Sequence, residues 1–328
     1  MLRSEELLTE ATVAAYVARR GIVSHGEPLS VQPLGGGVSN VVLAVESPHT
    51  RVVVKQSLPR LRVADEWLAN RERAVTEAEA LRLAAQLTPD AIPRVFDVDP
   101  VECALVMELA PPGWLTWKEF LLAGEADAGV AARVGSLLAA WHRETMGGGT
   151  GAFSDQTVFD QLRVDPYYRT LARRRPELAP EIERHVERML ATRLCLVHGD
   201  YSPKNVLLGD GGLWVIDFEV AHVGDPVFDL AFMLNHLFLK AIHRPAGEES
   251  YRACAAAFWD AYREEVAASL VSTGRHLFGH LGCLMAARVD GKSPVEYLDE
   301  SGREAARRVG ASLLLEPPES LDAAWERM

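Results

Sequence analysis

Hydrophobic and polar positions repeat with two different periods along the chain, and the period changes near residue 113. Before that point, short apolar runs bounded by turn residues predict strands. An amphipathic helix is predicted to open the chain and to stop at Gly21, and a second helical repeat spans residues 66–87. The strand-like runs are residues 41–45, 51–55, 92–98 and 104–109. Beyond residue 113 the apolar positions recur mainly at helical spacing. The pattern predicts an α+β protein with a small antiparallel sheet followed by a mainly helical part.

Two prolines and a glycine at residues 111–113 mark the change of period. We therefore predict an N-terminal lobe of residues 1–110 and a helical C-terminal lobe of residues 111–328. The helical pattern of the second lobe is interrupted by two short apolar runs, 194–197 and 213–216, with polar residues between them. This interruption carries the candidate chemistry.

The composition narrows the classes of function. The 328 residues carry a formal net charge of −12, which argues against a protein that binds nucleic acid, because such surfaces are basic. An acidic surface suits a cationic substrate, although it also simply favours solubility. The first twenty residues lack a continuous apolar core, and no stretch of about 18 residues is free of charge. These features predict a cytoplasmic protein with no membrane partner.

The cysteines give no sign of a metal site or of disulfides. All four lie far apart, without the paired spacing of zinc ligands. They are Cys103, Cys195, Cys254 and Cys283. We expect buried thiols that are not paired with one another.

Polar residues follow both of the apolar runs that interrupt the helical lobe. Residues 198–205 read HGDYSPKN, and Asp217 follows the second run. Phosphoryl transfer needs a carboxylate near the attacking hydroxyl and oxygen ligands for Mg²⁺. Asp200 suits the first role, and Asn205 with Asp217 suits the second. The alternative for this segment is a polar turn with an Asx cap.

Residues 198–205 together with Asp217 resemble the catalytic and metal-binding segments of the aminoglycoside phosphotransferase-like kinases, and the resemblance extends over roughly residues 30–290. It implies a two-lobed, protein-kinase-like fold with the nucleotide between the lobes. It also implies that Asp200 is the catalytic base and that Asn205 and Asp217 bind Mg²⁺. Protein kinases carry His-Arg-Asp where this chain has His-Gly-Asp, and glycine where it has Glu219. Both departures favour a small-molecule kinase.

A glycine-rich segment lies directly before the first predicted strand pair. Residues 34–40 read LGGGVSN, and glycines let backbone amides approach phosphates closely. Such a segment is also a common hairpin turn, and it lacks the full spacing of known nucleotide loops. Its place before Lys55 matches the order that the resemblance implies. The phosphate-binding candidates are Gly35, Gly36, Gly37 and Ser39.

Lys55 ends a run of three valines, where a charge requires an anionic partner. The resemblance implies that it pairs with nucleotide phosphates and with a helix glutamate. Glu77 and Glu79 are the candidates for that glutamate, and they face different directions on a helix. Glu77 fits the family pattern better, while both could also be surface charges.

The resemblance assigns further residues to binding and support. Backbone groups of Glu108 and Ala110 would read adenine at the hinge between the lobes. Asp229 would steady the catalytic loop, which includes His198. Lys204 could touch the transferred phosphate or be solvated. Independently of the resemblance, residues 287–294 place charges around a turn that could line the substrate cleft, with Arg288, Asp290 or Lys292 contacting substrate, or that could be a polar helix end.

These observations together predict a phosphotransferase that uses ATP or GTP with Mg²⁺ and phosphorylates a hydroxyl of a small molecule. The acceptor would be an aminoglycoside-like antibiotic or a polar metabolite. The alternatives are a methylthioribose-type sugar kinase and a nucleotide-binding protein without catalysis. A protein kinase is disfavoured, because residues 218–228 are too few for a regulated activation segment. The sequence leaves the acceptor and the oligomeric state open.

Overall fold

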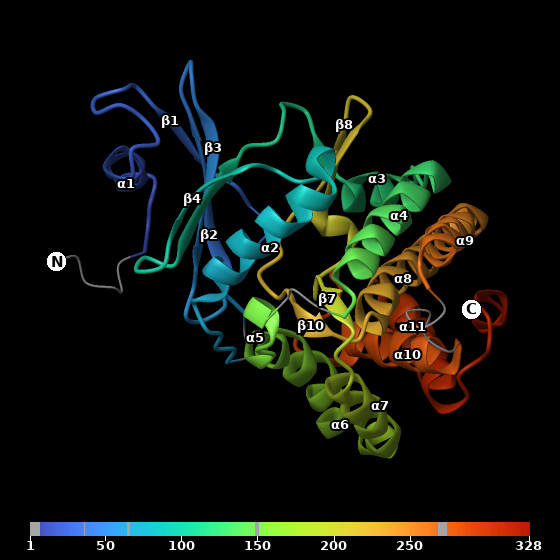
Figure 1. Cartoon of the computed structure of the whole chain (residues 1–328). Helices are drawn as coiled ribbons and strands as arrows, with labels where there is room; N and C mark the ends of the chain where they lie inside the picture. Colours follow the sequence, from blue (N-terminus) through green and yellow to red (C-terminus); the bar gives the residue numbers. More distant parts are fainter. Residues whose placement is uncertain (1–6, 36, 64–65, 148–150, 268–273) are drawn as a thin grey trace. The chain divides into compact units, whose positions relative to one another are not determined.

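The computed structural model describes residues 7–35, 37–63, 66–147, 151–267 and 274–328. Its contacts group the chain into two compact units (Figure 1). The first unit is Met1–Trp114 with Leu207–Val220, and the second is Leu115–Val206 with Ala221–Met328. The chain therefore crosses between the units three times. The small sheet and the mainly helical part confirm the predicted fold class.

The first unit is built on an antiparallel sheet with the strand order β1-β2-β3-β5-β4. Its strands are β1 (Ser30–Pro33), β2 (Asn40–Glu46), β3 (Arg51–Ser57), β4 (Val95–Asp99) and β5 (Ala104–Glu108). A tight turn joins β2 to β3, in which the Ser47 amide donates to the Thr50 carbonyl at 2.7 Å. Residues of β3 that point to either face of the sheet are buried, and this explains its continuous apolar run.

Helices cover the two faces of this sheet (Figure 1). α1 (Val13–Arg19) packs Tyr16 and Val17 against alternate residues of β2, β3 and β5. α2 (Arg73–Leu87) covers the opposite face, toward which Lys55 points. Because successive side chains of a strand alternate between faces, the lysine avoids the apolar cluster under α1.

The prediction that the second helix begins at residue 66 is wrong, because α2 begins at Arg73. The preceding residues instead hydrogen bond to the segment that follows β3. The Leu61 amide donates to the Trp67 carbonyl at 2.9 Å, and the Ala69 amide donates to the Pro59 carbonyl at 3.2 Å. These bonds satisfy backbone groups that a longer helix would have paired internally.

Residues 207–220 belong to the first unit, although the sequence pattern placed them in the second lobe. They include most of a hairpin of β8 (Val206–Gly209) and β9 (Gly212–Val215). The indole of Trp114 lies so close to Gly209 and Gly212 that a Cβ there would be 2.2 Å and 2.5 Å from it. The two glycines thus let the tryptophan pack directly on the hairpin backbone.

The second unit is mainly helical (Figure 1). Its longer helices are α4 (Ala128–Thr145), α7 (Ala179–Ala191), α8 (Val227–His243), α9 (Glu248–Glu265), α10 (Gly274–Asp290) and α11 (Glu300–Leu315). The shorter ones include α3 (Trp117–Ala123), α5 (Thr157–Phe159), α6 (Thr170–Arg174), α12 (Leu321–Trp325) and the π-helix η3 (Asp160–Arg169). α4 lies against α9, and Gly135 permits their close approach, since a Cβ there would be 2.3 Å from the Phe258 carbonyl oxygen.

A two-stranded ribbon lies among these helices and carries the catalytic-loop candidate. β7 (Cys195–Val197) pairs antiparallel with β10 (His222–Gly224). All four cysteines are buried and free of disulfides, as predicted. Among the residues that the structure describes, no helix is both long enough and apolar enough to cross a membrane.

Candidate active site

Lys55 lies in the middle of the first unit's sheet and is only 6% exposed. Its register on β3 places it between Val42 of β2 and Leu105 of β5. Its ammonium group forms an ion pair with Glu77 at 2.7 Å and a second one with Asp217. The buried charge thus has the anionic partners that its apolar surroundings require.

Glu77, and not Glu79, is the helix partner of Lys55. Glu77 lies on the buried side of α2 with a side chain that is 1% exposed. Glu79 points away and pairs with Arg82 at 2.7 Å, with half of its side chain exposed. The structure therefore resolves the alternative that the sequence left open.

Asp217 follows β9 in a left-handed backbone conformation, with φ of 72°. Aspartate and asparagine tolerate this conformation better than other side chains with a Cβ. The turn brings the carboxylate to Lys55, while 18% of the side chain remains exposed. Asp217 is thus the most exposed carboxylate of the set around the lysine.

Glu219 belongs to a buried network that the sequence did not predict. It accepts hydrogen bonds from the Ser39 hydroxyl at 2.8 Å and the Asn40 amide at 2.9 Å. Arg73 donates to it at 3.0 Å and also bonds the Leu58 carbonyl. Arg73 and Glu77 are one helical turn apart, so one face of α2 holds both Glu219 and Lys55.

The charges of this cluster perturb one another. Burial opposes the charged form of Lys55, but the negative charges of Asp217 and Glu77 outweigh it and raise the pKa of the lysine. Burial also raises the pKa of Glu77, with added repulsion from Asp217 and Glu219. Oxygens of these three carboxylates lie within 4.8 Å of one another. Such a crowded anionic set is chemically suited to a hard divalent cation.

The glycine segment lies between β1 and β2 of the same sheet. Gly36 lies outside the described residues, and a Cβ on Gly35 or Gly37 would meet no atom within 4 Å. The Ser39 hydroxyl is held by Glu219.

At the hinge candidates, the backbone amide of Glu108 donates to the Arg94 carbonyl at 2.8 Å. The carbonyl of Ala110 accepts from Arg51 at 3.3 Å. Both residues are half-buried.

Asp229 of α8 holds the start of the catalytic loop in the second unit. Its two carboxylate oxygens accept from the amides of His198 at 2.7 Å and Gly199 at 2.9 Å. Gly199 has φ of 77°, which permits the sharp turn after β7. His142 of α4 contacts the same carboxylate at 3.3 Å. Burial would raise the pKa of Asp229, but the hydrogen bond and charge of His142 lower it.

Asp200 is buried beneath two positive side chains. One carboxylate oxygen pairs with Arg163 at 3.0 Å and the other with Lys204 at 2.8 Å. Burial alone would raise the pKa of Asp200, but these two charges lower it below its usual range. Asn205 donates its amide to the Asp200 carbonyl and carboxylate, both at 2.9 Å. This orientation leaves Oδ1 of Asn205 as the atom that could bind a cation.

Arg163 was not predicted from the sequence. It lies 37 residues before Asp200 on η3, where its guanidinium also donates to the Gly199 carbonyl at 2.7 Å. η3 contains Pro166, and π-helical segments occur often at functional sites. The sequence around Arg163 is polar and contains a proline, and nothing in it indicated a contact with Asp200.

The second unit contains further cationic side chains besides the two that pair with Asp200. Arg288 donates to the Tyr167 hydroxyl at 3.2 Å, and the ammonium of Lys240 lies 5.4 Å above the Tyr297 ring. Burial would raise the pKa of Tyr167, but the charges of Arg288 and Arg163 lower it. Burial, together with the charges of Lys118 and Arg288, lowers the pKa of Lys240 from 10.5 to about 7.

The other two candidates near Arg288 are engaged in ion pairs. Asp290 pairs with Arg175 at 3.2 Å and with Arg307 at 3.0 Å. Lys292 pairs with Asp165 at 2.8 Å. Of the three, Arg288 alone contributes to the electrostatic surroundings of Lys240.

Lys240→Met should stabilise the protein in a pH-dependent way. The pKa of Lys240 is lower in the folded chain, so the unfolded chain binds more protons between about pH 7 and 10.5 and stability rises with pH there. The cost of burying this lysine is therefore complete below pH 7 and absent above about 10.5. We expect a gain of ~2–5 kcal/mol at pH 6 that disappears near pH 10.5, measured by urea unfolding across pH.

Lys292→Met is the matched control for this measurement, because Lys292 belongs to the same unit but has a carboxylate partner. Its loss should be neutral or slightly destabilising at pH 6. A Lys240→Met variant that is no more stable at pH 6 than at pH 10 would mean that the lysine is not held in a positive field.

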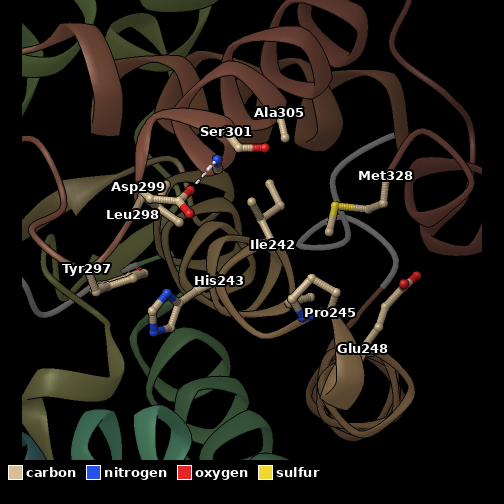
Figure 2. A pocket seen from close by; sticks show the side chains of 12 residues that line it. Ile242, His243, Pro245, Glu248, Tyr297, Leu298, Asp299, Ser301, Ala305 and Met328 are labelled. Carbon is tan, nitrogen blue, oxygen red and sulfur yellow. Dashed lines mark hydrogen bonds between the residues drawn. The ribbon is translucent and has the colours of Figure 1, made fainter.

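A separate pocket of about 480 Å³ lies at the C-terminal end of α8 (Figure 2). His243, Tyr297 and Met328 line it together with the start of α11. Asp299 on its wall accepts a hydrogen bond from the Gly302 amide at 2.8 Å and so caps that helix. None of the predicted catalytic residues lines this pocket.

The sequence matches the model of the phosphotransferase enzyme family over residues 30–269. Methylthioribose kinase of Geobacillus thermodenitrificans is 25% identical, and the match covers 96% of this chain and 94% of that protein.

Solved structures share the fold at lower identity. A choline/ethanolamine kinase family protein of Mesorhizobium loti has a TM-score of 0.52 at 17% identity, covering 97% of this chain and 98% of that one. An amicoumacin kinase, solved with AMP-PNP and Ca²⁺, has a TM-score of 0.53 at 15% identity, covering 96% of each chain. At these identities the likeness concerns the fold alone.

Proposed function

The chain belongs to the phosphotransferase enzyme family and is a small-molecule kinase, and we propose that it transfers the γ-phosphoryl group of ATP to a hydroxyl of a sugar-like acceptor that carries no positive charge. The observation that carries the acceptor assignment is the set of cations beyond Asp200 in the second unit. Neither the length of the chain nor its net charge suggests this assignment.

In the first unit, Lys55 would bind the nucleotide phosphates while Glu77 fixes its position. Gly35 and Gly37 would place backbone amides near those phosphates. We propose Mg²⁺ as the divalent metal, with Asp217 as a ligand, because oxygen-rich anionic sets suit this cation. The bound metal would offset phosphate charge during transfer. Glu108 and Ala110 would contact the base through their backbone groups.

In the second unit, Asp200 would accept the proton of the attacking hydroxyl. Its lowered pKa keeps it ionised at neutral pH, as a base must be. Asn205 would offer its Oδ1 as a metal ligand. Lys204, which already contacts Asp200, would meet the charge of the transferred group, and Asp229 with His198 would hold the loop in place.

The charges of the second unit support a neutral or anionic acceptor over a cationic one. Five cations interact with one another or with Asp200 in this part of the second unit: Lys118, Arg163, Lys204, Lys240 and Arg288. Two carboxylates also act on groups in this region, Asp200 and Glu296, and Glu296 is paired with Lys118. A polycationic aminoglycoside would be repelled by such a field, while a neutral or anionic sugar would not.

The curated relatives point the same way. Methylthioribose kinases match nearly the whole chain, and their named substrate is a sugar derivative. This supports the sugar-kinase alternative over an antibiotic acceptor. It does not fix the individual sugar, since identity is near one quarter.

The test is ATP consumption with Mg²⁺ across neutral thiosugars and pentoses, sugar acids, aminoglycosides and amino alcohols. We expect turnover on neutral or anionic sugars, with kcat/KM at least ~100-fold above that for any aminoglycoside. Lys240→Met should raise the KM of the best acceptor about tenfold with little change in kcat, if the lysine binds it.

Lys292→Met should leave both constants unchanged, since that lysine pairs with Asp165. Efficient phosphorylation of an aminoglycoside would refute the acceptor assignment but leave the kinase assignment intact. Equal kcat/KM for cationic and neutral acceptors would also refute it.

A further inference from the structure

Three histidines of the second unit meet in its interior, away from the residues assigned to phosphoryl transfer. His185 comes from α7, and His276 with His280 comes from α10. The two on α10 are four residues apart and so project from one face of the helix. All three are buried, and one nitrogen from each ring lies within 4.8 Å of the others.

The outer nitrogens of two of these rings are held by hydrogen bonds. Nε2 of His276 lies 2.9 Å from a carboxylate oxygen of Asp225, which can only accept, so Nε2 carries the proton. Nδ1 of His276 is then unprotonated and carries a free lone pair. Nδ1 of His280 lies 3.0 Å from the Tyr168 hydroxyl. When Nδ1 donates its proton to that oxygen, Nε2 of His280 is unprotonated and carries a free lone pair. Metal-binding histidines commonly donate their other N–H to such a partner.

The inner nitrogens have no such partner. Within the described part of the chain, neither Nδ1 of His276 nor Nε2 of His280 has a hydrogen-bond partner, although both are buried. A buried polar atom without a partner costs free energy, and few remain in native proteins. Two such atoms in one three-histidine cluster indicate a ligand that binds lone pairs.

Gly279 leaves the space that the imidazole of His185 occupies. A Cβ on Gly279 would lie 2.2 Å from Cε1 and Nε2 of His185, so any side chain there would displace the imidazole. Gly279 lies between His276 and His280 on α10. The helix thus presents two imidazoles with a gap between them that the third imidazole fills.

We propose that His185, His276 and His280 bind a divalent transition-metal ion, with Zn²⁺ as the favoured metal. Imidazole nitrogens suit zinc, copper, iron and nickel, whereas magnesium prefers oxygen. Three protein nitrogens and one solvent oxygen are a common zinc ligand set. Zn–N bonds of about 2.1 Å place the nitrogens roughly 3.4 Å apart, so binding requires the rings to move inward by no more than about an ångström.

The proposed metal links parts of the second unit that are distant in sequence. It joins α7 to α10 directly, and the Asp225–His276 hydrogen bond extends the link to the start of α8. Asp225 also accepts from the Val227 amide at 3.0 Å, two residues before Asp229. We infer a structural role, since the metal would stiffen the support of the catalytic loop without touching substrate.

The test uses the full chain, stripped with a chelator and titrated with Co²⁺ and then Zn²⁺. We expect one equivalent of Co²⁺ to give the visible absorption of a nitrogen-ligated, low-coordinate ion, which Zn²⁺ then removes. Zinc at 100 times its dissociation constant should raise Tm by about 5 °C. His185→Gln and His280→Gln should each weaken Zn²⁺ binding at least ~100-fold.

Two control variants separate this site from other metal-binding groups. His243→Gln removes a histidine of the same unit outside the cluster and should leave Zn²⁺ affinity unchanged. Asp217→Asn alters the carboxylate set of the first unit and should also leave it unchanged. The proposal fails if the wild-type chain gives no 1:1 cobalt spectrum, a result that does not depend on whether the variants fold. It also fails if both cluster variants bind zinc as tightly as the wild type.

Discussion

Asp200→Asn is expected to lower kcat by about 10³-fold while changing the affinity for ATP by no more than about twofold. The variant keeps the shape of the side chain and removes the proton acceptor. Its single amide oxygen can accept from Arg163 or from Lys204 but not from both, because these cations bind different carboxylate oxygens. The loop itself stays held by Asp229, which accepts from the backbone amides of His198 and Gly199. Steady-state rates with the best acceptor, together with nucleotide titration, measure the two effects separately.

Asp160→Asn is a suitable control for this experiment. Asp160 is a partly exposed aspartate of the same unit, it pairs with Arg169, and it begins the helix that carries Arg163. Its loss should leave kcat within about twofold. If Asp200→Asn turned over at the wild-type rate, Asp200 would not be the base. If the wild type bound ATP without turnover on any acceptor, the non-catalytic alternative would replace the kinase.

Short-range patterns predicted the elements that carry the site. Lys55 stands out because a charge at the end of three valines is unusual in a strand. The segment 198–205 stands out because several groups with related chemistry lie within one turn. Each signal is contained within a few neighbouring residues. Lys55 lies on the strand β3, and the segment 198–205 directly follows the strand β7.

Contacts distant in sequence could not be predicted in this way. Glu219 meets Arg73 across 146 residues, and Arg163 meets Asp200 across 37. A buried ion pair depends on how elements pack, and no local pattern records its partner. The helix pattern of α2 held a partial signal, because Arg73 and Glu77 share one face.

The overall charge of the chain and the local charges of the second unit favour different acceptors. The chain carries a net charge of −12, which suited a cationic substrate. The interior of the second unit around Lys240 and Arg288 is instead positive. Net charge sums the whole surface, while recognition depends on the few charges that the substrate meets.

Asp217→Asn should weaken Mg²⁺-dependent ATP binding at least ~10-fold, which is ~1.4 kcal/mol or more. Asparagine tolerates the left-handed backbone of this position nearly as well as aspartate, so the change isolates the charge from backbone strain. The loss removes one of the two anionic partners of Lys55 and the most exposed oxygen donor of the carboxylate set. Nucleotide titration at several Mg²⁺ concentrations measures the effect.

Asp210→Asn is the matched control, because Asp210 lies in the same segment and also has a positive φ, of 46°. It occupies the turn between β8 and β9 and should leave ATP binding unchanged. A higher Mg²⁺ requirement in Asp217→Asn alone would assign this carboxylate to the metal. Weaker ATP binding that excess Mg²⁺ does not restore would instead assign it to the position of Lys55. Undiminished binding at every Mg²⁺ concentration would exclude both roles.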